Sequence, residues 1–301
     1  MPRRDVMTDN PGERIAKVMA RAGLCSRRDA ERWIADGRVS VDGTVLTSAA
    51  LTVSAANTVL VDGNPLPAAA ETRLWRYHKP PGLVTSHSDP QGRPTVFERL
   101  PKGMGRVISV GRLDLNSEGL LLMTNDGELA RRLELPSTGW QRRYRVRVYG
   151  EVKEDRLAAL TRGITVEGVR YGPIEASLET GTAKNSWLNV SLSEGKNREI
   201  RKVLEHLKLN VNRLIRISYG PFHLGKMGRG EVDEIAGKVL RDQLVEAGDG
   251  AAEGPASPKG NFRGKGWAKS KKKPAGNTPG WKPTSKKSIA KDGKPNRKPR
   301  P

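Results

Sequence analysis

The segment 250–301 cannot form a hydrophobic core, which limits the folded part of the chain to the residues before it. The segment holds 15 Lys and Arg against two acidic residues, Glu253 and Asp292, and is rich in Gly, Pro, Ser and Asn. Such a composition buries too little apolar surface to offset the entropy lost on ordering. We therefore predict a disordered basic tail over 248–301 and a flexible N-terminus over 1–11. The remaining length suffices for two modest domains.

The chain as a whole is strongly basic, with 54 Lys and Arg against 33 Asp and Glu and a formal net charge of +21. Of this excess, +13 belongs to the segment 250–301 and +8 to the other residues. The excess favours a polyanionic partner, without distinguishing RNA, DNA and acidic lipid. Trp267 and Trp281 lie among the tail lysines, where they could stack on unpaired bases. A tail that serves only solubility is the alternative.

Several classes of protein are disfavoured by the residues that the chain lacks. A single cysteine, Cys25, excludes an internal disulfide and argues against a cysteine-based metal site. The four histidines have no metal-ligand spacing, and no apolar run approaches the roughly 18 residues of a membrane span. The charged N-terminus has no apolar segment typical of a secretion signal. We expect a cytoplasmic monomer without metal, cofactor or membrane contact.

A compact module of two helices followed by strands is predicted over residues 12–72. Apolar residues from Ile15 to Ala22 follow helical spacing, and Ser26 with Asp29 forms a capping-box pattern before a second helix. Strands follow at 39–41, 44–46 and 58–61, with a hairpin turn at Asp42 and Gly43. Its first part holds a cluster of basic residues, namely Arg14, Lys17, Arg21, Arg27, Arg28, Arg32 and Arg38. They suit an RNA groove, although a solvated helix face would have the same pattern.

A larger α+β domain is predicted after a linker at 65–70. Strands are expected at 74–78, 107–110 and 120–124, with a polar loop at 111–119. Residues 143–148 alternate strictly, which places Tyr144 on one face of a strand and arginines on the other. Ile200 and three later apolar residues mark an amphipathic helix. The irregular order of strands and helices favours a mixed, mostly antiparallel sheet.

The candidate chemistry centres on Asp114 in the polar loop. The chain has no phosphate loop, dinucleotide fingerprint or HExxH motif, which argues against nucleotide hydrolysis, dinucleotide redox chemistry and zinc hydrolysis. Asp114 lies two residues after Arg112, and a carboxylate beside arginines suits an attacking or proton-removing group. A loop-capping aspartate would have the same pattern, and Tyr144 could equally be a core tyrosine.

Two resemblances narrow these alternatives. The run RIAKVMARAGLCSRRDAERWIADGRVSVDG resembles the S4 RNA-binding domain. GRLDLNSEGLLLMTNDGELARRL resembles the signature of the RsuA/RluB/RluE/RluF family of pseudouridine synthases. HKPPGLVTSHSD, RRYRVRV and LSEGKNREIRKVLEHL resemble further motifs of that family, in the same order. The resemblance implies an S4-like domain at 12–72 and a pseudouridine synthase catalytic domain at 73–247.

The resemblance also implies roles for individual residues. Asp114 matches the essential aspartate, which attacks the uridine ribose or base or acts as a base in a glycal route. Tyr144 matches the tyrosine that stacks on the target uracil and is a candidate for removing its C5 proton. Arg201 matches the basic residue that pairs with the aspartate. Contacts with substrate or RNA are assigned to Arg112, Ile200, Arg198, Lys79, Arg14, Lys17, Arg27, Arg28 and Arg32, with Ile200 forming an apolar wall over the base.

The implied reaction converts a uridine of 23S rRNA to pseudouridine, near the peptidyl-transferase region. It cleaves a glycosidic bond, rotates the base and forms a carbon–carbon bond, with no cofactor. The substrate would be free rRNA or a precursor of the large ribosomal particle. Alternatives are another rRNA uridine, a non-catalytic ribosome-associated RNA-binding protein, and a base-removing glycosylase.

Deletion of residues 250–301 tests the predicted tail. We expect weaker RNA binding, mostly at low salt, and a flatter salt dependence, because fewer counterions would be released on binding. Turnover at saturating RNA should change little. The measurement is the RNA dissociation constant as a function of salt concentration, and an unchanged slope would remove the tail from RNA binding.

Overall fold

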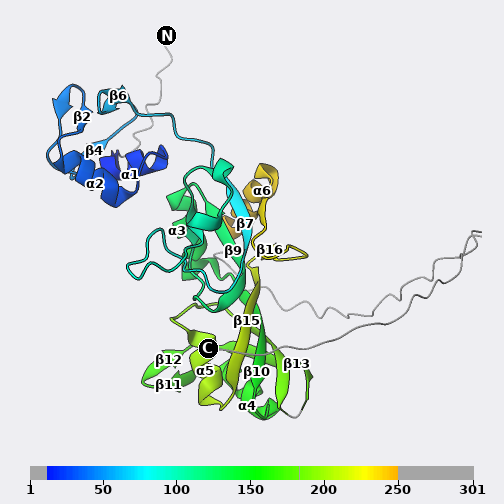
Figure 1. Cartoon of the computed structure of the whole chain (residues 1–301). Helices are drawn as coiled ribbons and strands as arrows, with labels where there is room; N and C mark the ends of the chain where they lie inside the picture. Colours follow the sequence, from blue (N-terminus) through cyan, green and yellow to red (C-terminus); the bar gives the residue numbers. More distant parts are fainter. Residues whose placement is uncertain (1–11, 183, 250–301) are drawn as a thin grey trace, which may run out of the picture. The chain divides into compact units, whose positions relative to one another are not determined.

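In the computed structural model, which describes residues 12–182 and 184–249, the N-terminal module has the two predicted helices followed by the predicted strands, together with three short strands that were not predicted, one of them before the first helix (Figure 1). Its elements are β1 (Glu13–Arg14), α1 (Ile15–Arg21), α2 (Arg27–Ala35), β2 (Val39–Val41), β3 (Thr44–Val45), β4 (Thr52–Val53), β5 (Val59–Val61) and β6 (Asn64–Pro65). Strands β3, β2, β5 and β6 form an antiparallel sheet, and β1 pairs with β4. The predicted tail boundary is wrong at residues 248 and 249, which belong to the last helix, and residues 250–301 lie outside the described residues, as do residues 1–11.

Local interactions explain why this module folds as its sequence indicates. Ser26 Oγ accepts the backbone N–H of Asp29 at 3.0 Å, and the Asp29 carboxylate accepts the N–H of Ser26 at 3.1 Å, which confirms the capping box. Ile15 and Ile34 are fully buried in the module's core. The predicted linker is wrong at its first two residues, because Pro65 belongs to β6 and Leu66 packs against this core.

The larger domain is built on a nine-stranded sheet. Its main path is β13, β14, β10, β15, β9, β7 and β17, while β16 pairs with β15 and β8 with β9. The strands are β7 (Leu74–Lys79), β8 (Ile108–Val110), β9 (Ser117–Thr124), β10 (Arg142–Tyr149), β13 (Ile174–Gly181), β14 (Asn185–Leu192), β15 (Asn210–Tyr219), β16 (Phe222–His223) and β17 (Val232–Glu234). All of these pairings are antiparallel except β15 with β9, which confirms the mixed, mostly antiparallel sheet.

Helices and a small hairpin complete this domain. The helices are α3 (Gly127–Glu134), α4 (Glu154–Ala159), α5 (Glu199–His206) and α6 (Gly237–Asp249), and the hairpin is β11 (Ile164–Val166) with β12 (Val169–Tyr171). One core cluster contains Tyr144 and the apolar side of α5, and another contains the apolar side of α3. Within the described residues, no helix is long and apolar enough to cross a membrane.

The parallel pairing of β9 with β15 joins the two halves of the large sheet. Gly119 lies opposite Arg216 in this pair, with φ +107°. A Cβ at Gly119 would lie 2.3 Å from the carbonyl oxygen of Arg216, so the strands can approach this closely only at glycine. The predicted loop at 111–119 is therefore wrong at its last three residues, which begin β9. Ser117 and Glu118 are polar but buried by this pairing, so their residue types gave no strand signal.

Replacement of Gly119 by alanine should destabilise the protein strongly. The added methyl group meets backbone and the φ angle is unfavourable, so we expect a loss of about 3 kcal/mol or more in the free energy of unfolding. Gly103→Ala is the matched control, because nothing lies within 4 Å of a Cβ there. Urea unfolding measures both variants. Equal stabilities would contradict the close approach at Gly119.

Candidate active site

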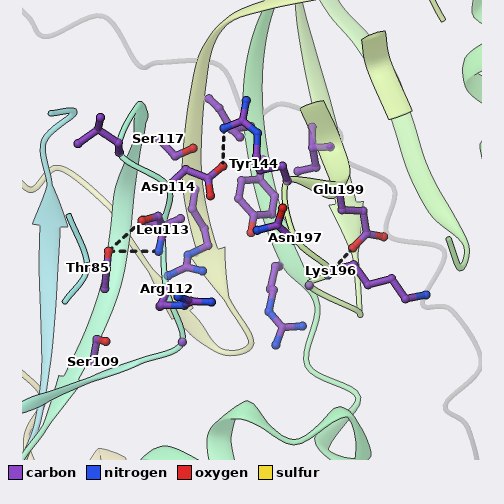
Figure 2. A pocket seen from close by; sticks show the side chains of 18 of the residues that line it. Thr85, Ser109, Arg112, Leu113, Asp114, Ser117, Tyr144, Lys196, Asn197 and Glu199 are labelled. Carbon is purple, nitrogen blue, oxygen red and sulfur yellow. Dashed lines mark hydrogen bonds and ion pairs between the residues drawn. The ribbon is translucent and has the colours of Figure 1, made fainter. Parts of the chain in front are cut away.

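A cleft of about 700 Å³ lies where the loop 111–116, strands β10 and β15, and the start of α5 meet. Figure 2 shows Asp114 and Tyr144 facing one another across it, with Arg112 on the same loop as Asp114 and with Asn197 and Glu199 on the far side. The cleft has a volume suited to one small ligand or one nucleotide. The structure thus brings together the residues that the sequence places far apart.

Asp114 is paired with two arginines from the segment that begins α5. Its Oδ2 lies 3.5 Å from Nη1 of Arg198 and 4.0 Å from Nε of Arg201. Arg201 is fixed from behind, since it donates to the carbonyls of Val211 at 3.2 Å and Asn116 at 3.1 Å. Arg198, for which the sequence predicts a contact with substrate or RNA, thus lies beside the aspartate. The two ion pairs draw one carboxylate oxygen, Oδ2, toward the arginines at the edge of the cleft, and 31% of the Asp114 side chain is exposed.

Tyr144 and Ile200 belong to the apolar part of the cleft wall. Tyr144 is 8% exposed and lies on the buried face of β10, as the alternation predicts, while Arg143 and Arg147 are exposed on the other face. Ile200 is 6% exposed at the start of α5. An aromatic ring and an aliphatic side chain beside a carboxylate can sandwich a planar base.

The prediction that Lys79 contacts RNA is wrong, because its side chain is fully buried. Its Nζ donates to the carbonyls of Pro80 at 3.1 Å, Asp114 at 3.1 Å and Ser117 at 2.9 Å, with Leu115 at 3.4 Å. Burial lowers the pKa of Lys79 to about 8, an effect that nearby Asp114 and Glu118 oppose. Lys79 therefore holds the backbone of the Asp114 loop, a role that its motif alone does not reveal.

Other contacts hold the same loop. Thr85 Oγ1 donates to the carbonyl of Leu113 at 2.9 Å, and the N–H of Gly82 donates to the carbonyl of Leu115 at 2.7 Å. The N–H of Gly111 donates to the carboxylate of Glu134 at 2.6 Å. The loop that carries Asp114 is thus fixed along its length before any substrate binds, which favours a preorganised site.

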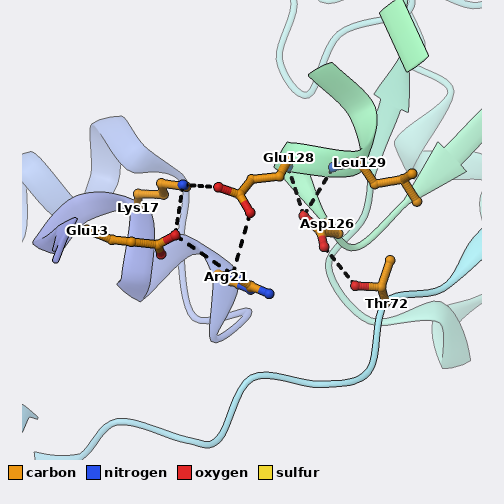
Figure 3. A network of polar contacts seen from close by, with 7 residues as sticks. All are labelled: Glu13, Lys17, Arg21, Thr72, Asp126, Glu128 and Leu129. Carbon is orange, nitrogen blue, oxygen red and sulfur yellow. Dashed lines mark hydrogen bonds and ion pairs between the residues drawn. The ribbon is translucent and has the colours of Figure 1, made fainter. Parts of the chain in front are cut away.

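The remaining predicted RNA contacts differ in whether an acidic side chain among the described residues pairs with them. Arg112 lines the cleft and is exposed, and Arg14, Arg27 and Arg28 are exposed in the N-terminal module. Arg32 is also exposed but pairs with Asp29. Lys17 donates to Glu13 at 2.9 Å and also pairs with Glu128, where Arg21 lies nearby (Figure 3). The carboxylates of Glu128 and Glu13 raise the pKa of Lys17, which stays protonated, and their negative charges offset its positive charge, so it is a poorer RNA contact than the sequence indicates.

Sequence reasoning missed Glu199, a buried acid beside the cleft. Its Oε2 accepts the N–H of Lys196 at 2.9 Å, and its Oε1 has no hydrogen-bond partner among the described residues. Burial and the neighbouring carboxylate of Glu194 raise the pKa of Glu199 to about 7. Glu194 accepts the N–H of Gly172 and pairs with Lys196 at 2.8 Å, which keeps its own pKa low. Only the buried position, which the sequence does not show, distinguishes Glu199 from a surface acid.

The chemistry available here is that of a carboxylate, two arginines and an aromatic ring. Within the described residues, no group of three or more His, Cys, Asp or Glu side chains could hold a metal ion. The cleft suits a planar base attached to a group on which Asp114 can act.

Replacement of Glu199 by glutamine should change how stability depends on pH. Because the pKa of Glu199 is about 7 in the folded protein and 4.5 ordinarily, the folded state binds the extra proton between these values. Wild-type stability should therefore fall as pH rises from about 5 to about 8. Over this pH range we expect the free energy of unfolding of the wild type to fall by on the order of 2 kcal/mol relative to that of Glu199→Gln. Urea unfolding at several pH values measures it, with exposed Glu205→Gln as control; parallel curves for wild type and Glu199→Gln would contradict the prediction.

The chain is similar to known proteins over both of its domains. Residues 73–206 match the RNA pseudouridylate synthase family, and residues 13–63 match the S4 domain family. An "Uncharacterized RNA pseudouridine synthase" of Rickettsia felis is 48% identical over 228 residues, which cover 76% of this chain and 99% of that protein. "Ribosomal large subunit pseudouridine synthase B" of Yersinia pestis is 44% identical over 245 residues, covering 78% of this chain and 77% of that protein.

A solved structure agrees with the sequence matches. A crystal structure of a pseudouridylate synthase superimposes with a TM-score of 0.54 at 26% identity, and the match covers 76% of this chain and 98% of the other. The order of an S4 domain followed by the synthase domain is the one that the sequence predicts. The chain therefore belongs to the RNA pseudouridine synthase family and is an RNA pseudouridine synthase that carries an S4 domain.

Proposed function

We propose that this enzyme converts a uridine of 23S rRNA to pseudouridine, at the position conventionally numbered 2605. The relatives in Yersinia pestis, Pasteurella multocida and Salmonella typhi are named ribosomal large subunit pseudouridine synthase B, which supports a substrate in the large ribosomal particle. The segment 193–235 resembles the B enzyme as well. The enzyme would act in the cytoplasm as a monomer, on free rRNA or on a precursor of that particle.

The observation that carries the mechanism is the Asp114 carboxylate held between two arginines at the edge of a cleft with an aromatic wall. The reaction breaks the bond between N1 of uracil and C1′ of ribose and forms a bond between C5 and C1′ in its place, while C5 loses a proton and N1 gains one. C1′ becomes electron-poor during cleavage, and a fixed carboxylate beside it stabilises that charge. We assign Asp114 as this carboxylate, whether it attacks the ribose, attacks the base or removes a proton.

Tyr144 and Ile200 have a second role in this proposal. The target uridine must leave its stack to reach Asp114, so it flips into the cleft. Once detached, the uracil must turn without escaping, and a wall formed by Tyr144 on one strand and Ile200 on a helix retains it. Arg201 keeps Asp114 in place throughout, because its own guanidinium is fixed by two carbonyls.

Two rival functions lead to different products. A base-removing glycosylase would release free uracil, whereas an isomerase releases none. A non-catalytic RNA-binding protein would release neither uracil nor the C5 proton. The assay must therefore follow both uracil and the C5 hydrogen.

Replacement of Asp114 by asparagine tests the mechanism on a 23S rRNA fragment labelled with tritium at C5 of uridine. Asparagine keeps the size of the side chain but removes its negative charge, so we expect tritium release to fall by about 10³-fold or more. RNA affinity should change little. Asp155→Asn, on the exposed side of α4, is the matched control and should release tritium like the wild type. Full activity of Asp114→Asn, or free uracil from the wild type, would refute the proposal.

A further inference from the structure

We propose that Arg142 and Arg216, which flank the ring of Tyr219 in the cleft, form a binding site for a phosphate of the RNA beside the target uridine. Both arginines line the cleft that contains Asp114 and Tyr144. This inference deepens the proposed function and rests on it for the choice of RNA.

The strand register places both arginines next to the tyrosine that faces the base. Arg142 begins β10 two residues before Tyr144 and lies opposite Tyr219 on β15. Arg216 lies directly opposite Tyr144 on the same neighbouring strand. Alternate residues of a strand are about 7 Å apart on one face. The distance from a group bound at Arg142 to a base stacked on Tyr144 is thus comparable with the distance from phosphate to base within one nucleotide.

Tyr219 fixes the two guanidinium groups. Its ring is 1% exposed, and its hydroxyl donates to the carbonyl of Leu133 at 2.9 Å. The guanidinium carbon of Arg142 lies 4.8 Å from the ring centroid, and that of Arg216 lies 5.2 Å from it. Nη2 of Arg142 also donates to the tyrosine hydroxyl at 3.1 Å. Both cations are therefore oriented before RNA arrives.

The charge of these two arginines is not balanced by acids. Among residues 12–182 and 184–249, no carboxylate lies within 4.0 Å of either guanidinium. Their partners are neutral: Arg142 donates to the carbonyl of Ser193, and Nε of Arg216 donates to that of Leu120 at 2.7 Å. Glu134 also lines the cleft, but its carboxylate accepts the N–H of Gly111.

Arg216 indicates an anion site most strongly, because this arginine is buried. Only 3% of the residue is exposed, and its Nη2 has no hydrogen-bond partner within the described part of the chain. A buried cation without an anion is costly unless a partner binds. On the opposite face of the same strands, by contrast, Arg145 pairs with Glu179 at 2.7 Å and Arg213 pairs with Glu118.

The phosphodiester is the group that fits this arrangement. It carries the full negative charge of each RNA unit, and the planar guanidinium matches two phosphate oxygens at once. Two oriented arginines beside the base-facing Tyr144 would hold the backbone on one side of the flipped nucleotide. The base and ribose would then be positioned against Asp114.

The test combines a neutral phosphate with a neutral side chain. Full-length wild type and Arg142→Gln are compared on a 23S rRNA stem-loop that carries one methylphosphonate, placed 5′ or 3′ of the target uridine. We expect Arg142→Gln alone to weaken RNA binding about tenfold, and one of the two methylphosphonates alone to weaken it about tenfold as well. Arg142→Gln should bind that methylphosphonate RNA no more weakly than either single change does. Arg147→Gln, on the exposed face of the same strand, is the control. Any loss of RNA affinity that it causes should add to the loss caused by the methylphosphonate. Additive losses for Arg142→Gln at both linkages would overturn the proposal.

A second readout separates this inference from the proposed target. Conversion of the unmodified stem-loop by the wild type tests the target, whereas the coupling is measured in affinities and needs no turnover. In addition, the slope of log affinity against log salt should fall by about one for Arg142→Gln. An unchanged slope with normal conversion would overturn the phosphate site and leave the target intact. Failed conversion together with the expected coupling would overturn the proposed target and leave the phosphate site intact.

Discussion

The parallel pairing of β9 with β15 at Gly119 is the constraint on which the rest of the catalytic domain depends. It joins the strands that follow the Asp114 loop to the strands that carry Tyr144 and Arg216. The backbones approach so closely that a Cβ at Gly119 would lie 2.3 Å from a carbonyl oxygen. Because the loop with Asp114 ends where this pairing begins, the geometry of the pair decides where the carboxylate lies relative to the aromatic wall.

Buried cations then fix the details of the site. Lys79 binds the carbonyls of the Asp114 loop from beneath, and Arg201 binds the carbonyls of Asn116 and Val211 from the side. A backbone held in this way costs little to reorganise when the substrate arrives. The chain thus uses some of its positive charge to shape the site, whereas arginines such as Arg142 and Arg216 keep theirs available for an anion.

Local patterns in the sequence were sufficient for part of this account. Three features depend only on residues close together in the sequence, and each is present as predicted. They are the capping box at Ser26, the alternation of β10 and the apolar side of α5. Asp114 and Arg201 were placed in one site by resemblance, and the structure brings them to 4.0 Å. Lys79 was misassigned because a lysine buried among carbonyls has the same local sequence as an exposed one. The strand at Ser117 depends on its pairing with β15, a segment distant in the sequence, and the raised pKa of Glu199 depends first on burial.

The most direct test of the central claim is to map pseudouridines in 23S rRNA by carbodiimide modification and primer extension, in cells with and without the gene. A signal at one uridine, near the peptidyl-transferase region, should disappear when the gene is removed. It should return when the wild-type gene is restored. Persistence of every 23S signal without the gene would contradict the claim that this enzyme modifies 23S rRNA.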